Sequence, residues 1–217
     1  NGKLYGGTLA GSADTRWGKH WRISGKAQLT GIELVPLQAA LRKPARLSGR
    51  LSAHVTYSAL ASSAAQLGHA LVLNAPFEVA GGEWHGVDLS RVAELPLGKL
   101  ADGGTTRFDR LKADLALRGE DIRLNKLCVR SPALVAAGNV AIAPDQALSG
   151  KLDVSVAKTA GFVGVPVALS GTTADPSLSL TRMGAIGAVI GTVLLPGIGT
   201  SLGLSAGGRL EGKVECD

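Results

Sequence analysis

Apolar and polar residues alternate along several segments of this 217-residue chain. In residues 47–57 every second position is apolar, aromatic or glycine, and every position between them is polar or charged. Successive side chains of a β-strand point to opposite faces, so this pattern predicts strands with one buried and one solvated face. Residues 111–118, 122–125 and 148–156 largely follow the same rule, and Gly-Glu-Asp at 119–121 predicts a hairpin turn.

The composition agrees with a fold of many short strands. Hydrophobic residues make up 45% of the chain, enough for a substantial core, while only 4% of residues are aromatic and 30 are glycine. We therefore predict a mainly β fold with an antiparallel, twisted or curved sheet that is built from repeated strand units. A few short helices are predicted at residues 34–42, 59–71 and 89–95, together with an apolar C-terminal helix rich in glycine and alanine.

Two pairs of similar short segments indicate that a strand unit repeats. Gly31-Ile32-Glu33-Leu34 and Gly86-Val87-Asp88-Leu89 each precede an apolar helical turn, and residues 46–51 resemble residues 147–152. The predicted organisation is a β-rich domain at 1–182 with repeat units at about 1–100 and 101–182, an apolar segment at 183–208 and a terminal strand or tail at 209–217.

The apolar face of such strands must be shielded from water, because exposed apolar surface costs about 25 cal/mol per Å². A second sheet, the short helices or the acyl chains of a lipid could each cover it, and the sequence does not choose among them. If lipid covers this face, the candidate contact residues are Leu47, Leu51, Val55, Leu111, Leu115, Leu152 and Val154.

Residues 183–208 contain no charged side chain and have glycines at helical spacing. Three interpretations fit: a helix that packs on the apolar sheet face, an element that inserts into or lies on a membrane, and a flexible segment. The candidate packing or membrane-contact residues are Ile186, Val189, Ile190, Val193 and Leu194.

Signals for catalysis and metal binding are weak. Cys128 and Cys216 are far apart in the sequence, so a disulfide or two free thiols explain them equally well, and a metal site is not expected. The four histidines are isolated, and no nucleophile elbow or phosphate-binding loop occurs. We predict a protein without a catalytic site or cofactor; a hydrolase is kept only as a third hypothesis.

The formal net charge of +6 comes from scattered Lys and Arg residues. The basic residues at 107–123 have a single aromatic residue, Phe108, among them and form no base-stacking platform, so nucleic acid is not an expected partner. A solvated polar face accounts for this charge.

Several motifs, taken in order, resemble the C-terminal region of AsmA-like proteins over about residues 5–182. They are the two Gly-[IV]-[ED]-Leu segments, Leu-Ser-Gly-Arg-Leu at 47–51, Gly-Thr-Thr-Arg-Phe-Asp-Arg-Leu at 104–111, Leu-Val-Ala-Ala-Gly-Asn-Val at 134–140 and Val-Pro-Val-Ala-Leu-Ser-Gly-Thr-Thr-Ala-Asp-Pro at 165–176.

The resemblance implies a periplasmic envelope protein, anchored to the inner membrane by a segment upstream of Asn1 and involved in outer-membrane assembly. Larger relatives are thought to conduct phospholipid along an apolar β-groove. Phospholipid or a membrane surface and envelope proteins are therefore the expected partners. The alternative function is a protein–protein scaffold of an envelope or secretion machine that binds no lipid.

Overall fold

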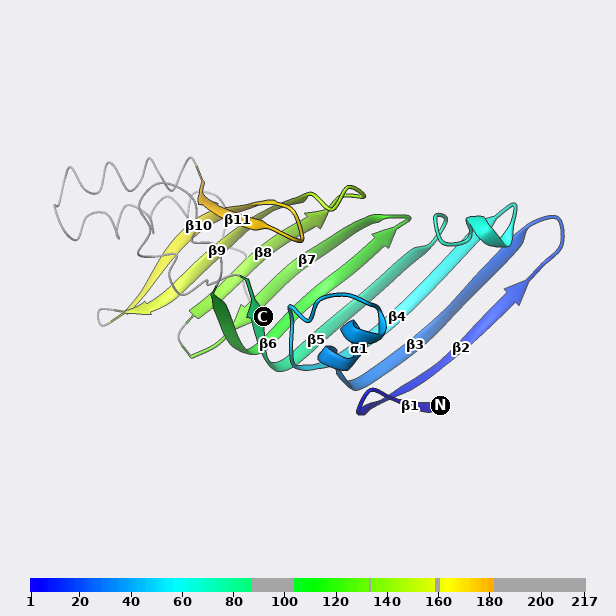
Figure 1. The fold of residues 1–217 in the computed structure, drawn as a ribbon, viewed down its shortest axis with the longest axis horizontal. Helices are drawn as coiled ribbons and strands as arrows, with labels where there is room; N and C mark the ends of the chain where they lie inside the picture. The colour runs from blue at the N-terminus through cyan, green and yellow to red at the C-terminus, as the bar shows by residue number, and fades with distance from the viewer. Residues whose placement is uncertain (87–103, 133, 159–160, 182–217) are drawn as a thin grey trace.

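The computed structural model describes residues 1–86, 104–132, 134–158 and 161–181. The strands in these ranges form one eleven-stranded sheet, in which each strand pairs antiparallel with the next one along the chain (Figure 1). The predicted mainly β, antiparallel fold is confirmed. The elements are β1 (Gly2–Leu4), β2 (Gly7–Arg16), β3 (Trp21–Glu33), α1 (Leu34–Ala40), β4 (Arg50–Ala61), the 3-10 helix η1 (Ala64–Gln66), β5 (Val72–His85), β6 (Thr105–Arg118), β7 (Asp121–Arg130), β8 (Leu134–Ile142), β9 (Leu148–Lys158), β10 (Gly161–Gly171) and β11 (Pro176–Leu180).

The predicted strands lie where the alternation placed them, with one boundary shifted. The segments 111–118, 122–125 and 148–156 fall in β6, β7 and β9. The strand predicted from residue 47 begins later, at Arg50, and Leu47 forms an isolated bridge with Trp84. Gly49 explains the shift because its φ of +119° interrupts the extended backbone between Leu47 and β4.

The helix predictions have three different outcomes. The helix at 34–42 is confirmed as α1, whereas the one at 59–71 is wrong: residues 59–61 end β4, and a 3-10 turn follows. Ala59 and Ala61 are buried where they pair with β3, so strand pairing overrides the helix propensity of alanine. The helix predicted at 89–95 lies outside the described residues.

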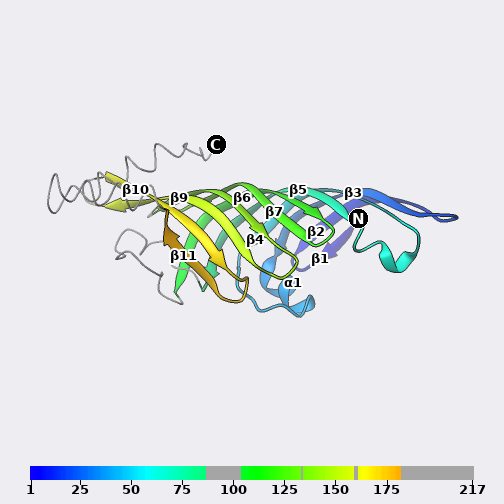
Figure 2. The same ribbon diagram turned by 90° about the horizontal axis from the view of Figure 1, so that it is seen from above.

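The sheet is twisted and curled, as predicted (Figure 2). Two bulges bend it, at Gly31 in β3 with a φ of +67° and at Lys126 in β7 with a φ of +51°, and both sit where the strand register shifts. The curl brings distant segments together, since Arg46 Nη2 donates a 2.8 Å hydrogen bond to the Ala174 carbonyl, 128 residues away.

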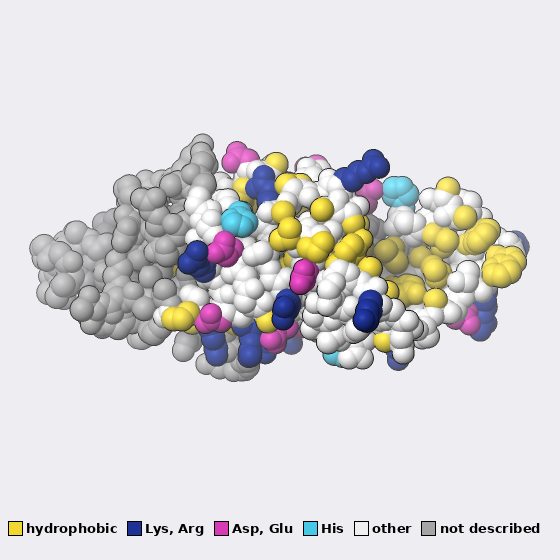
Figure 3. Space-filling model, turned by 60° about the horizontal axis from the view of Figure 1, so that its bottom comes forward, with side chains coloured by type: hydrophobic (Ala, Val, Ile, Leu, Met, Phe, Trp, Pro, Cys, Tyr) yellow, Lys and Arg dark blue, Asp and Glu magenta, His cyan; other side chains and the backbone are white. Residues whose placement is uncertain are grey.

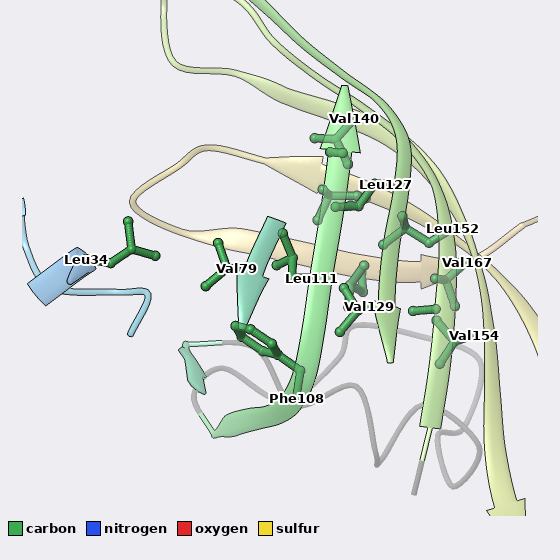
Figure 4. Packing of buried hydrophobic residues seen from close by; sticks show 14 residues of the cluster. Leu34, Val79, Phe108, Leu111, Leu127, Val129, Val140, Leu152, Val154 and Val167 are labelled. Atoms are coloured by element: carbon green, nitrogen blue, oxygen red, sulfur yellow. The ribbon is translucent and has the colours of Figure 1, made fainter. Parts of the chain in front are cut away.

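A hydrophobic cluster fills the inside of the curl. Val79, Leu111, Val129 and Val154 extend into it from β5, β6, β7 and β9, while Leu34 of α1 approaches from the opposite side (Figure 4). Among the described residues, Leu34 and Leu37 of α1 pack against this cluster. The remaining buried members are Phe108, Ala113, Leu127, Ala136, Val140, Leu152, Val167, Leu169 and Leu178.

Replacing Leu152 with alanine should show that this cluster stabilises the fold. Its side chain is only 3% exposed, so Leu152→Ala should lower the free energy of unfolding by about 2–4 kcal/mol in a urea titration. The neighbouring Lys151 is exposed on the opposite face, and Lys151→Ala should change the free energy of unfolding by less than about 0.5 kcal/mol. Equal losses in the two variants would contradict the assignment of the buried face.

Candidate functional site

The inner face of the sheet carries rows of apolar side chains that cross many strands. The strand register places Leu51 opposite Val79, Val79 opposite Leu111, and Leu111 opposite Val129; the row continues through Ala136 to Val154. A second row runs parallel to it. Its members are Tyr57, Leu73, Leu117, Ile122, Ile142 and Leu148.

No residue in these two rows is charged, and the curl of the sheet makes their surface concave. We call the surface formed by the inward-facing apolar residues of β2–β11 the apolar trough. The trough can accept a hydrophobic molecule only where its side chains remain accessible, so the exposure of its residues decides which part of it can bind.

The structure places the seven lipid-contact candidates on one side of the sheet but in two environments. Leu111, Leu152 and Val154 belong to the buried cluster, where they are already covered by other side chains. The other four are half-buried: Leu47 packs against the cluster from outside the strands, while Leu51, Val55 and Leu115 lie on the inner face. Only the second group has surface left for a ligand.

The trough is most open towards the free end of the β2–β3 hairpin. Leu178 of β11 and Leu34 of α1 are buried and belong to the part of the trough that the hydrophobic cluster fills. Ile23, Leu29 and Tyr57, on β3 and β4, are half-buried. Figure 3 shows hydrophobic side chains gathered in a hollow at the right-hand end of the view. The open part of the trough thus spans β2 to β5.

The sequence prediction missed the contribution of β3 to this open part. Residues 21–29 alternate Trp-Arg-Ile-Ser-Gly-Lys-Ala-Gln-Leu, and Trp21, Ile23 and Leu29 face the trough. The same period-two rule that identified Leu51 would have found them. Gly25 lies between them, and a Cβ there would come within 2.7 Å of the Tyr57 ring, so glycine lets that ring lie across β3.

Helix α1 is held over one part of the trough by Gln38 and by a 3.1 Å hydrogen bond from the Leu34 N–H to the Gly49 carbonyl. The Gln38 side chain donates to the carbonyls of Leu34 and Leu47, and its Oε1 accepts hydrogen bonds from the backbone N–H groups of Arg46, at 3.1 Å, and Leu47, at 3.3 Å. These bonds join the helix to the segment that leads into β4. Leu34 and Leu37 can therefore cover the cluster as a unit with that segment.

The outer face of the sheet is polar and charged. Glu78 on β5 lies 3.2 Å from Arg110 and 3.7 Å from Lys112 on β6, and Lys126 on β7 lies 3.5 Å from Asp114. These pairs are partly exposed, so each contributes little to stability. They place charged side chains on the outer face of β5–β7, opposite the uncharged inner face.

Two sequence hypotheses involve residues that lie outside the described ranges. Cys128 lies on the outer face of β7 opposite Lys112 and is 9% exposed, but Cys216 is outside the described residues and their pairing stays a prediction. The apolar segment with Ile186, Val189, Ile190, Val193 and Leu194 is also outside them.

Two searches of the described ranges gave negative results. They contain no group of three or more His, Cys, Asp and Glu side chains that could hold a metal ion. Among the helices of these ranges, none is long and apolar enough to cross a membrane.

The fold and the trough together define a class of protein, a curled β-meander domain with an apolar inner face. The AsmA family model matches residues 1–127, which is more than half of the chain, and the chain belongs to the AsmA family. The family is associated with the bacterial cell envelope. No curated protein and no solved structure matches the chain.

Removing the Gln38 side chain should loosen α1 from the trough. In Gln38→Ala we expect amide hydrogens in the last turn of the helix, such as the Leu41 N–H bonded to the Leu37 carbonyl, to exchange with solvent about tenfold faster. The reason is that about 1.4 kcal/mol of side-chain hydrogen bonding is lost. Gln66→Ala in the exposed η1 turn is the control, and it should leave this exchange unchanged. Unchanged exchange in Gln38→Ala would contradict this role of the glutamine and show that the other contacts of the helix are enough to hold it.

Proposed function

We propose that the open part of the apolar trough holds acyl chains of phospholipid, and that the chain handles phospholipid during outer-membrane assembly without catalysing a reaction. The observation that carries the proposal is the set of half-buried, uncharged side chains that continues from the buried cluster into β3 and β4. An acyl chain laid on this surface would gain about 0.8 kcal/mol for each methylene group removed from water.

The chemistry of the trough favours this kind of ligand. Its rows contain no charged residue and one hydroxyl-bearing ring, that of Tyr57, so they offer few polar groups to orient a sugar, nucleotide or peptide. Acyl chains need only a long, uncharged surface. Membership of an envelope-associated family that is not known for enzymatic activity supports the same proposal.

The proposed location is the periplasm, where a segment upstream of Asn1 would anchor the protein to the inner membrane. In that position the trough would be available to lipid leaving or entering a membrane. The charged outer face of β5–β7 would remain in water, as its exposed ion pairs require.

A scaffold function is the second candidate, and the edge of β2 is the observation that favours it. Strand β1 pairs only with residues Gly7, Thr8 and Leu9 of β2, so among the described strands Ala10–Arg16 has a neighbour on one side only. Such an edge can accept a strand from another protein. A folded protein that carries no lipid and ignores added lipid would make the scaffold the better explanation.

The lipid proposal can be tested with matched substitutions on β4. Val55 faces the open trough, whereas the adjacent Thr56 faces the outer side, where its hydroxyl contacts the Asn74 carbonyl. After incubation with detergent-dispersed phosphatidylglycerol, we expect native mass spectrometry to show bound lipid on the wild type. Val55→Glu should reduce the bound fraction about tenfold, because the carboxylate would have to lose water against an acyl chain.

Thr56→Glu adds the same charge and should keep wild-type binding. The unfolding midpoint of each variant, measured by circular dichroism, separates loss of binding from loss of fold. A wild-type protein that takes up no lipid, or equal losses in two folded variants, would contradict the proposal.

A further inference from the structure

The β2–β3 hairpin ends in a group of residues that lies mostly outside the trough. The sequence Arg-Trp-Gly-Lys-His-Trp-Arg occupies residues 16–22, which we call the hairpin tip, and it contains two of the three tryptophans of the chain. It also contains three of the basic residues: Arg16, Lys19 and Arg22. Such a concentration is notable because aromatic residues make up only 4% of the chain.

The tip projects from the sheet into solvent. The β2–β3 hairpin extends beyond the neighbouring strands at one end of the molecule (Figures 1 and 2). Every residue from Gly11 to His20 is exposed, and Trp17 is 73% exposed. An indole this exposed contributes little to the fold, so its presence needs another explanation.

Two further exposed hydrophobic side chains lie at the same end of the sheet. Leu60, 54% exposed, pairs with Arg22 across β3 and β4, and Val72, 40% exposed, lies beside it at the start of β5. Both are on the outer face, which is mostly polar elsewhere. On the inner face of the same end, Trp21 and Ile23 are half-buried. This end of the sheet therefore carries accessible apolar side chains on both faces.

The charges around the tip are mainly positive. Asp14 forms a 3.1 Å ion pair with Arg16, but both side chains are highly exposed, so the pair is weak. Lys19 and Arg22 form no ion pair with another residue of the described ranges. The β6–β7 turn at the same end of the sheet adds two acidic residues, Asp121 and Glu120, and Glu120 lies 3.2 Å from His69. The basic residues of the tip thus remain available to an anionic surface.

We propose that the hairpin tip is a membrane-contact site that docks this end of the protein on a bilayer containing anionic phospholipid. Tryptophan prefers the boundary between acyl chains and headgroups, and each Lys or Arg near an anionic leaflet adds about 1 kcal/mol of attraction. Trp17 enters the headgroup region, while Lys19 and Arg22 contact lipid phosphates. Docking in this way brings the open end of the trough, with Trp21 and Ile23, to the bilayer surface.

This inference adds a membrane-contact site to the lipid-handling function proposed above, and the two can fail separately. Uptake of detergent-dispersed lipid tests the trough without a bilayer. Binding to vesicles tests the tip. A protein that takes up dispersed lipid but ignores vesicles would refute only the docking proposal.

The test is co-sedimentation of the purified chain with vesicles of phosphatidylcholine alone or of equal parts phosphatidylcholine and phosphatidylglycerol. We expect binding to the mixed vesicles, a blue shift of tryptophan emission on binding, and weakening by salt. Trp17→Ser should reduce vesicle affinity on the order of tenfold, and the double variant Lys19→Ser with Arg22→Ser should reduce it by at least that factor.

Two controls match these changes at other positions. Leu41→Ser removes a side chain that is 62% exposed at the end of α1, and Lys3→Ser with Arg50→Ser removes two exposed cations at the opposite end of the strands. Both should bind as the wild type does. The proposal is overturned if the wild type ignores the mixed vesicles, if it binds neutral vesicles equally well, or if the controls lose as much affinity as the tip variants.

Discussion

Consecutive antiparallel pairing that keeps inner-face residues opposite one another is the constraint on which this structure depends. Because each strand pairs with the next, a residue on the inner face of one strand lies opposite inner-face residues of both neighbours. Leu111 between Val79 and Val129 is one such case. The alternation of a single strand is thereby extended across the sheet into one apolar surface.

Such a surface must be covered, and the described part of the chain covers it mainly by bending. The bulges at Gly31 and Lys126 curve the sheet, and α1 with the loop after it spans the concave side as far as Ala174. This closes the region around Val154 and leaves β2–β5 half open. How far the side chains are covered, and not the total amount of apolar surface, distinguishes the structural core from the candidate binding surface.

The sequence predicted which side of the sheet each side chain occupies better than it predicted whether that side chain is buried. The positions of Leu111 and Leu115 on the inner face follow from a local period of two, which holds wherever the backbone is extended. Whether each residue is buried depends on the curl, which involves contacts between residues such as Arg46 and Ala174 that no local pattern encodes. The helix expected at 59–71 failed for a related reason, because pairing with β3 is a long-range effect.

Methyl NMR of the chain in the presence of a phospholipid with a nitroxide near the end of one acyl chain would test the central claim most directly. We expect the methyl signals of Leu29 and Val55, which lie on the open inner face of β3 and β4, to broaden strongly. The methyl signals of Val135, which lies on the outer face of β8, should be unaffected. Two results would contradict the assignment of the apolar trough as the lipid-binding surface: broadening of the Val135 signals alone, or no broadening of any of these signals at saturating lipid.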